Sequence, residues 1–122
     1  MEKLLRILIV EDDASITSLL VETLNSLGHN VCAVAATEED AIEYARDLQP
    51  DLMIVDAGLA AGNGISAMRT ILERQHTPHF FVTGNPRDVR AVFPDATVLQ
   101  KPFFVPELAA AIERTVSGPL RS

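Results

Sequence analysis

Carboxylates gather behind two apolar segments of the chain. Glu11, Asp12 and Asp13 follow the apolar run 4–10, and Asp56 ends a second such run. If Glu11, Asp12 and Asp56 converge, each pair of carboxylates about 4 Å apart repels by roughly 4 kcal/mol at an effective dielectric constant of about 20. A cation must then lie among them, and hard oxygen ligands with open coordination positions suit Mg²⁺ (or Mn²⁺). The residue types therefore predict a divalent metal site.

Two further polar residues follow later apolar runs. Thr83 comes directly after the run 80–82, and Lys101 lies just beyond the run 97–99. A metal, a lysine and a hydroxyl can together hold a phosphoryl group in line with a carboxylate nucleophile, because they neutralise its equatorial oxygens. We therefore expect Asp56 to be the nucleophile, with Thr83 as a hydrogen-bond donor and Lys101 as the cation that pairs with the phosphate.

Each of these residues, taken alone, also has a structural interpretation. Asp12 and Asp13 can cap the helix that follows, Thr83 can be a turn residue, and Lys101 can pair with a surface acid. Their joint occurrence at the ends of apolar runs favours the chemical interpretation for the set. Asp13 is the exception, because it is one acid more than the site needs, and we predict that it caps the helix.

Five apolar runs of strand length alternate with amphipathic segments. Alternating strands and helices, with near-continuous apolar strands, predict an α/β, doubly wound fold whose parallel sheet is covered on both faces. In such a sheet ligands bind at the carboxyl ends of the strands, where the polar residues above stand. The strands are expected at 4–10, 31–36, 52–55, 80–82 and 97–99, with helices beginning near residues 14, 37, 65, 86 and 106.

Apolar periodicity predicts which helical residues face inward. The fourth helix is the least specified, because only Val89, Val92 and Phe93 offer apolar anchors between Pro86 and Pro94, and we expect it to be short or partly disordered. The acidic run 38–40 is typical of a helix start, where acids interact favourably with the dipole. The other inward residues expected include Leu19, Leu20, Leu24, Ala41, Ala45, Ile65, Met68, Leu108, Ile112 and Val116.

Four separated motifs resemble those of the receiver domains of bacterial two-component response regulators, the CheY-like family. They are ILIVEDD at 7–13, DLMIVD at 51–56, VTG at 82–84 and KPF at 101–103. The resemblance covers nearly the whole chain. It implies a five-stranded sheet of order 2-1-3-4-5, as in flavodoxin and CheY.

The resemblance also implies a role for each site residue. Glu11 and Asp12 would be the acidic metal pair, Asp56 the phosphoacceptor and a metal ligand, Thr83 the switch hydroxyl and Lys101 the phosphate-pairing lysine. The main-chain carbonyl of Gly58 would complete the metal ligands, and the bond between Lys101 and Pro102 would be cis.

The chain departs from the family pattern in two places. Val98 stands where the family has its switch aromatic, so the usual coupled movement of an aromatic ring and the switch hydroxyl is unavailable. The interval between Thr83 and Lys101 is short for a helix and a strand. The sequence Phe81–Val82–Thr83–Gly84 resembles the subgroup of receivers, often single-domain, that bears a Phe-Ala-Thr-Gly motif.

These features predict a single receiver domain over 1–122, with an ordered core at about 4–117. It would accept a phosphoryl group from a histidine kinase or histidine phosphotransfer protein and signal by altered binding to a downstream protein. It would be no enzyme beyond catalysing its own phosphorylation and dephosphorylation. Two alternatives stay open: a receiver-like binding module that works without phosphorylation, and a receiver fragment of a longer regulator.

Two enzyme classes share the expected fold but fit the residues poorly. A flavodoxin needs a phosphate-binding loop after the first strand, where this chain has three acids that would repel phosphate. A phosphatase with an aspartyl nucleophile needs a second acid two residues after Asp56, where this chain has Gly58.

Composition limits the partners. A formal net charge of -7 opposes nucleic-acid binding, which depends on Lys and Arg neutralising phosphates. The first apolar run is too short for a signal peptide or membrane span, which predicts a cytoplasmic protein, expected as a monomer or weak dimer.

Cys32 is predicted to be a buried thiol, and His29, His76 and His79 are predicted to be solvated loop residues.

Overall fold

The computed structural model describes residues 4–117, which form five strands and five helices in strict alternation. The strands are β1 (Arg6–Val10), β2 (Asn30–Ala35), β3 (Leu52–Asp56), β4 (His79–Thr83) and β5 (Val98–Gln100). The helices are α1 (Ala14–Ser26), α2 (Glu38–Leu48), α3 (Gly64–Arg74), α4 (Pro86–Val92) and α5 (Val105–Val116). The first residues and the last five of the expected domain lie outside the described part.

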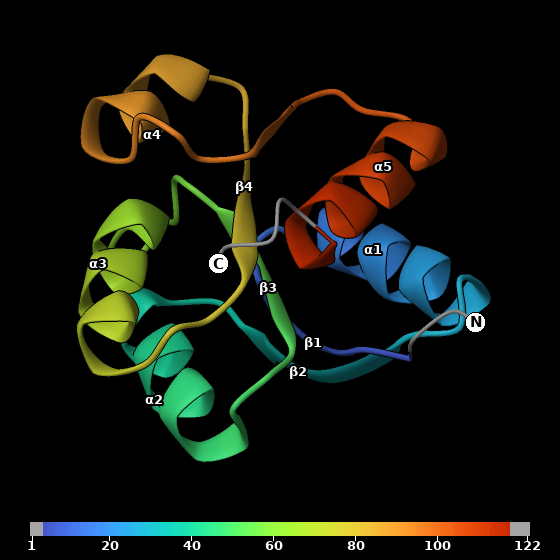
Figure 1. Ribbon diagram of the computed structural model, residues 1–122, viewed down its shortest axis with the longest axis horizontal. Coiled ribbons are helices and arrows are strands. Elements are labelled where there is room, and N and C mark those ends of the chain that lie inside the picture. The colour runs from blue at the N-terminus through green and yellow to red at the C-terminus, as the bar shows by residue number, and fades with distance from the viewer. Residues whose placement is uncertain (1–3, 118–122) are drawn as a thin grey trace.

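All five strands are parallel and follow the order β2-β1-β3-β4-β5, which confirms the predicted sheet. Helices α1 and α5 cover one face, and α2, α3 and α4 cover the other (Figure 1). Because both faces are covered, successive residues of one strand enter different cores: Ile54 packs with α1 and α5, while Val55 packs with α2 and α3. Every residue of β3 is buried, so its apolar sequence does not alternate with polar residues.

Local signals set the ends of the helices. The Asp13 carboxylate accepts hydrogen bonds from the backbone N–H groups of Ser15 and Ile16 at 2.8 and 3.1 Å, which confirms that it caps α1. Thr37 caps α2 in the same way. Gly28, just beyond α1, has φ of +91°, a conformation that glycine adopts without strain.

The short fourth helix is confirmed. Helix α4 has seven residues, no side-chain cap at Asn85 and a single buried residue, Val89. Its neighbour Phe93 packs against the core as expected. Three predicted inward residues are wrong: Leu19, Val92 and Val116 are exposed, because they lie at the edge of their helix's apolar face or near its end.

Two side chains differ from their sequence-based assignments. Cys32 is half-buried rather than buried, as are the residues on either side of it, because β2 lies at the edge of the sheet. His79 is no loop residue: it begins β4 and packs edge-on against Phe81 and Phe93. Burial accordingly lowers the pKa of His79. Among the described residues no helix is both long and apolar enough to cross a bilayer.

The first residue of α3 packs so closely on β3 that only glycine fits there. A Cβ added at Gly64 would overlap the carbonyl oxygen of Asp56 and lie 2.9 Å from a methyl of Val55. Alanine favours helix, so propensity alone predicts that Gly64→Ala stabilises the protein. We expect the opposite, a loss of about 1–3 kcal/mol from overpacking. Urea unfolding of the Gly64→Ala variant and the wild type measures this loss of stability.

Gly84 provides the control for this prediction, since a Cβ built there meets no atom within 4 Å. Gly84→Ala is expected to change stability by less than about 0.5 kcal/mol. Equal stability of the two alanine variants would contradict the close approach of α3 to Asp56.

Candidate functional site

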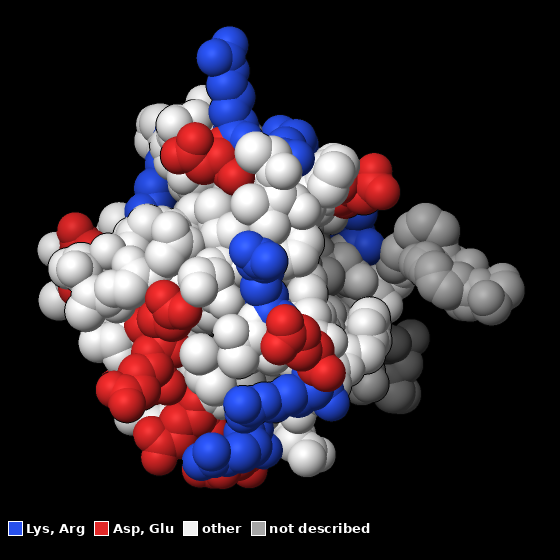
Figure 2. All heavy atoms as spheres, turned by 90° about the vertical axis from the view of Figure 1, so that its left-hand side faces the viewer, with Lys and Arg blue, Asp and Glu red and all other residues white. Residues whose placement is uncertain are grey.

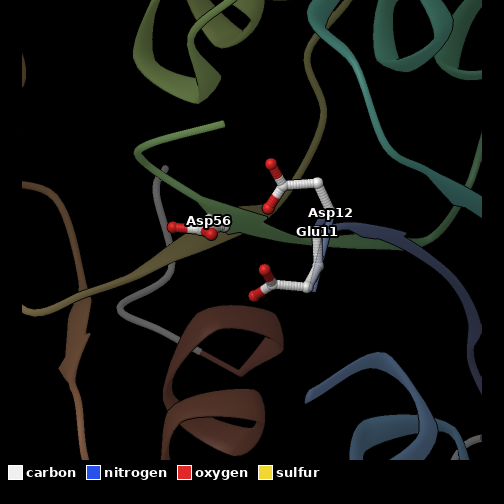
Figure 3. Close-up of side chains that lie close together, drawn as sticks. All are labelled: Glu11, Asp12 and Asp56. Carbon is white, nitrogen blue, oxygen red and sulfur yellow. The ribbon is translucent and has the colours of Figure 1, made fainter. Parts of the chain in front are cut away.

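Three carboxylates converge at the carboxyl ends of β1 and β3. Glu11 and Asp12 follow β1, and Asp56 ends β3, its hydrogen-bonded neighbour in the sheet. One carboxylate oxygen from each lies within 4.8 Å of the others, and the three side chains face a common space (Figure 3). The sequence-based expectation that these acids meet is confirmed.

Lys101 reaches the same space from beyond β5. Its Nζ lies 3.5 Å from Oδ2 of Asp56 and 3.6 Å from Oε1 of Glu11. The N–H of Lys101 donates to the carbonyl of Thr83 at 2.9 Å, which fixes the chain where the side chain departs. The bond to Pro102 is cis, as the resemblance implied. Within residues 4–117 no other cationic side chain lies within 4 Å of the three acids.

Thr83 ends β4, the strand on the other side of β3, and is buried. The β3–β4 register pairs Asp56 with Val82, so Thr83 lies one residue beyond that pair at the same edge of the sheet. Its Oγ1 accepts a hydrogen bond from the N–H of Asn85 at 3.0 Å. A hydroxyl that accepts one bond keeps its own proton to donate. The predicted donor therefore lies at the same edge of the sheet as Asp56, and its hydroxyl proton is available.

The loop between β3 and α3 forms hydrogen bonds with two of the acids. The N–H of Gly58 donates to Oδ1 of Asp56 at 3.1 Å, and the N–H of Ala60 donates to Oδ2 of Asp12. Both bonds orient carboxylates that the sequence assigned to the site. The role of the Gly58 carbonyl as a ligand stays a prediction. Asp13 instead caps α1, and its N–H donates to Oε2 of Glu11 at 3.1 Å.

Burial and like charge act strongly on Glu11. Its side chain is 3% exposed, and it shares the space with Asp56. Burial has the largest effect on this group and, together with the hydrogen bond with Asp56, raises the pKa of Glu11 to about 7. The hydrogen bond from the Asp13 N–H and the charge of Lys101 oppose this rise. One lysine does not neutralise three carboxylates.

The donor set fits a hard divalent cation. It offers carboxylate oxygens from two adjacent strands, buried on one side and open on the other, since Glu11 and Asp56 are buried and Asp12 is exposed. A divalent ion would supply the charge that Lys101 leaves uncompensated and would favour the ionised form of Glu11. These residues could therefore hold a metal.

Sequence reasoning missed residues that contact this site through the loop. Glu38 accepts hydrogen bonds from the loop at Asn63 and from Ser66, and Ala60 donates to Asp12. The acidic run 38–40 predicted only a helix start, and an alanine carries no side-chain signal. Only the fold shows that α2 begins beside the β3–α3 loop.

Comparison with known proteins gives one family for most of the chain. Residues 7–113 match the family described as response regulator receiver domain. The chain is 34% identical over 116 residues to the transcriptional regulatory protein PdtaR of Mycobacterium tuberculosis, covering 92% of this chain and 57% of that protein. It is 33% identical over 114 residues to the phyllosphere-induced regulator PhyR of Methylorubrum extorquens, covering 90% of this chain and 43% of that protein.

Solved structures of related proteins share this fold. The solution structure of the receiver domain of the Erythrobacter litoralis PhyR response regulator superposes with a TM-score of 0.86 at 27% identity, covering 98% of this chain and 97% of that one. The anti-anti-sigma factor PhyR from Bartonella quintana gives a TM-score of 0.82 at 26% identity, covering 96% of this chain and 49% of that one. This chain thus spans about half the length of the PdtaR and PhyR sequences it matches.

The raised pKa of Glu11 predicts how the metal-free protein responds to pH. Between its ordinary value near 4.5 and about 7 the folded state keeps a proton that the unfolded state has lost. Stability from this group therefore falls as pH rises through that window, by at most about 3 kcal/mol. Urea unfolding in EDTA at pH 5 to 8 measures the fall.

Glu11→Gln is the control, because glutamine keeps the shape and does not titrate. Its stability is expected to fall less than the wild type's over the same range. If the two proteins lose stability in parallel, the carboxyl of Glu11 is not the group responsible.

Proposed function

The chain belongs to the response regulator receiver domain family, and from this premise we propose that Asp56 accepts a phosphoryl group from a histidine kinase or histidine phosphotransfer protein. The supporting observation is the contact of Lys101 with both Asp56 and Glu11, at 3.5 and 3.6 Å. It supports the proposal because a phosphoryl-transfer site needs a nucleophile, further charged ligands and a cation close together.

The transfer forms one bond and breaks one. A carboxylate oxygen of Asp56 attacks phosphorus, and the bond between phosphorus and the donor's histidine nitrogen breaks, with the electron pair leaving on that nitrogen. Lys101 pairs with a phosphoryl oxygen as the new group arrives. Thr83 donates its hydroxyl proton in a hydrogen bond to another phosphoryl oxygen. The product is an acyl phosphate on Asp56, a labile species that water hydrolyses.

Glu11, Asp12, Asp56 and the Gly58 carbonyl would hold Mg²⁺ (or Mn²⁺). When bound, that ion neutralises charge on the carboxylates and on the phosphoryl oxygens. The chain's own residues orient the acids: the Gly58 N–H holds one oxygen of Asp56, and the Ala60 N–H holds one of Asp12. Both carboxylates keep an oxygen not engaged by these bonds.

The output we infer is altered binding to a protein rather than to nucleic acid. The net charge is -7, and on the face formed by α2, α3 and α4 basic side chains lie among acidic ones without a continuous basic surface (Figure 2). The domain would act in the cytoplasm as a monomer or weak dimer, catalysing only its own phosphorylation and dephosphorylation. Residues 1–122 would work as one receiver domain, alone or within a longer regulator.

Phosphorylation of Asp56 is tested with acetyl phosphate and Mg²⁺, followed by intact mass. We expect one acid-stable, base-labile phosphoryl adduct, which is strongly reduced in EDTA and absent in Asp56→Ala. Asp47→Ala is the control, because Asp47 lies on α2 and pairs with Arg46 away from the site. An unmodified wild type with a competent donor would favour the binding module that works without phosphorylation.

Lys101→Ala is expected to change the rate of phosphorylation and the affinity for Mg²⁺ in opposite directions. The variant lacks the cation that pairs with the phosphoryl oxygens, so the rate of phosphorylation should fall by about 10²-fold. Its affinity for Mg²⁺ should rise severalfold, because Lys101 no longer offsets the charge of Glu11 and Asp56. Stopped-flow phosphorylation and calorimetric titration measure the two effects. A fall in both quantities would mean that Lys101 mainly maintains the structure.

A further inference from the structure

The β3–α3 loop has few internal contacts that could hold it in place. Residues 57–63 are rich in alanine and glycine, most of the loop is exposed, and Leu59 is its one large apolar residue packed against the core. Its position therefore depends on hydrogen bonds to residues outside it. This matters for the site because the loop carries Gly58 and donates the Ala60 N–H to Asp12.

One acid outside the site binds the far end of this loop. Oε1 of Glu38 accepts from the N–H of Asn63 at 2.9 Å, and its Oε2 accepts from the hydroxyl of Ser66 at 2.7 Å. The N–H of Glu38 donates to the carbonyl of Ala61 at 3.2 Å. A single residue of α2 thus contacts the loop and the first turn of α3 with side chain and backbone, where the two helices run side by side (Figure 1).

The packing at Gly62 shows that this contact is close. A Cβ added at Gly62 would overlap the Cβ of Glu38 and lie 2.9 Å from its Oε1. Gly62 also has φ of +89°, which other residues rarely adopt. Glu38 forms no salt bridge among residues 4–117, and Thr37 rather than Glu38 caps α2. Its carboxylate is therefore engaged by the loop and not by its own helix.

We propose that Glu38 is a positioning residue for the acidic site, which holds the β3–α3 loop so that Gly58 and Ala60 orient the carboxylates of Asp56 and Asp12. The proposal rests on the proposed function for its consequence, since a displaced loop would slow phosphorylation of Asp56. Metal binding and loop order test it independently. Glu38 touches no reacting atom and acts only through the loop and the first turn of α3.

Two conservative variants distinguish the effect of the position of the Glu38 carboxylate from the effect of its charge. Glu38→Asp keeps the charge and the acidic first turn of α2 but is one methylene too short to reach both Asn63 and Ser66. Glu38→Gln keeps the reach and an acceptor for the N–H of Asn63 but loses the charge. Glu39→Ala is the matched control, because Glu39 is an exposed acid in the same turn with no hydrogen bond to the loop.

The first readout is Mn²⁺ affinity, measured by titration of the unphosphorylated protein. We expect Glu38→Asp and Glu38→Ala to weaken binding by about 3- to 10-fold, the range at which groups that orient ligands begin to matter. Glu38→Gln and Glu39→Ala should stay within about twofold of the wild type. The second readout is amide exchange in EDTA. The Ala60 amide, which has no bond to Glu38, should exchange faster in Glu38→Asp and not in Glu39→Ala.

The outcomes decide between the alternatives. Wild-type affinity in Glu38→Asp with weakened binding in Glu38→Gln would overturn the proposal, because charge and not position would then matter. Unchanged affinity and exchange in both would also overturn it. If the wild type binds Mn²⁺ in this Glu38-dependent way but takes up no phosphoryl group, the proposed function fails while the positioning role stands. Phosphorylation of the wild type at a rate matched by Glu38→Asp would leave the function standing and refute the role.

Discussion

The mutual repulsion of three carboxylates at one edge of the sheet is the constraint on which the rest of the structure depends. Glu11, Asp12 and Asp56 lie within 4.8 Å of one another, and Lys101 is the one cation that the described chain sets against them. Burial, the hydrogen bond with Asp56 and, to a smaller degree, the charge of Asp56 raise the pKa of Glu11 to about 7. An added cation would therefore stabilise this site by offsetting the charge that Lys101 leaves uncompensated.

Holding such a cluster together requires a rigid support, and the order of the strands provides it. The chain crosses over after β2 so that β1 and β3 become neighbours, which brings two separate acidic segments to adjacent strand ends. The strand ends are fixed because every residue of β3 is buried. Lys101 approaches from two strands away, held by its N–H bond to Thr83. Repelling groups stay close because the cores on both faces of the sheet leave the backbone no alternative position.

The sequence predicts most of this arrangement, because apolar runs mark the strands and the polar residues stand directly behind them. The prediction that Asp13 caps a helix is confirmed, because its position directly before α1 matters more than its charge. The sequence-based prediction was wrong about Leu19, Val92 and Val116, since apolar periodicity does not show where a helix leaves the core. His79 was misassigned because β4 begins one residue earlier than expected, and because its contact with Phe93 joins residues on opposite sides of α4. Glu38 and Ala60 escaped notice for the same reason, because their contacts join segments that the sequence does not connect.

If Asp56 is phosphorylated as proposed, a route from it to a binding surface would depend on the contacts that hold α4. Val98 offers no aromatic ring to move, and α4 itself buries only Val89. Its far end is fixed instead by Phe93, which stacks on Phe81 with ring centroids 5.7 Å apart. Its near end is tied to the site by one bond, from the N–H of Asn85 to the Thr83 hydroxyl. Under the proposed phosphorylation, a rotation of Thr83 toward the phosphoryl group would change that bond directly. We therefore expect the main chain just after Thr83 to carry the signal, with Phe93 as the fixed end about which α4 adjusts.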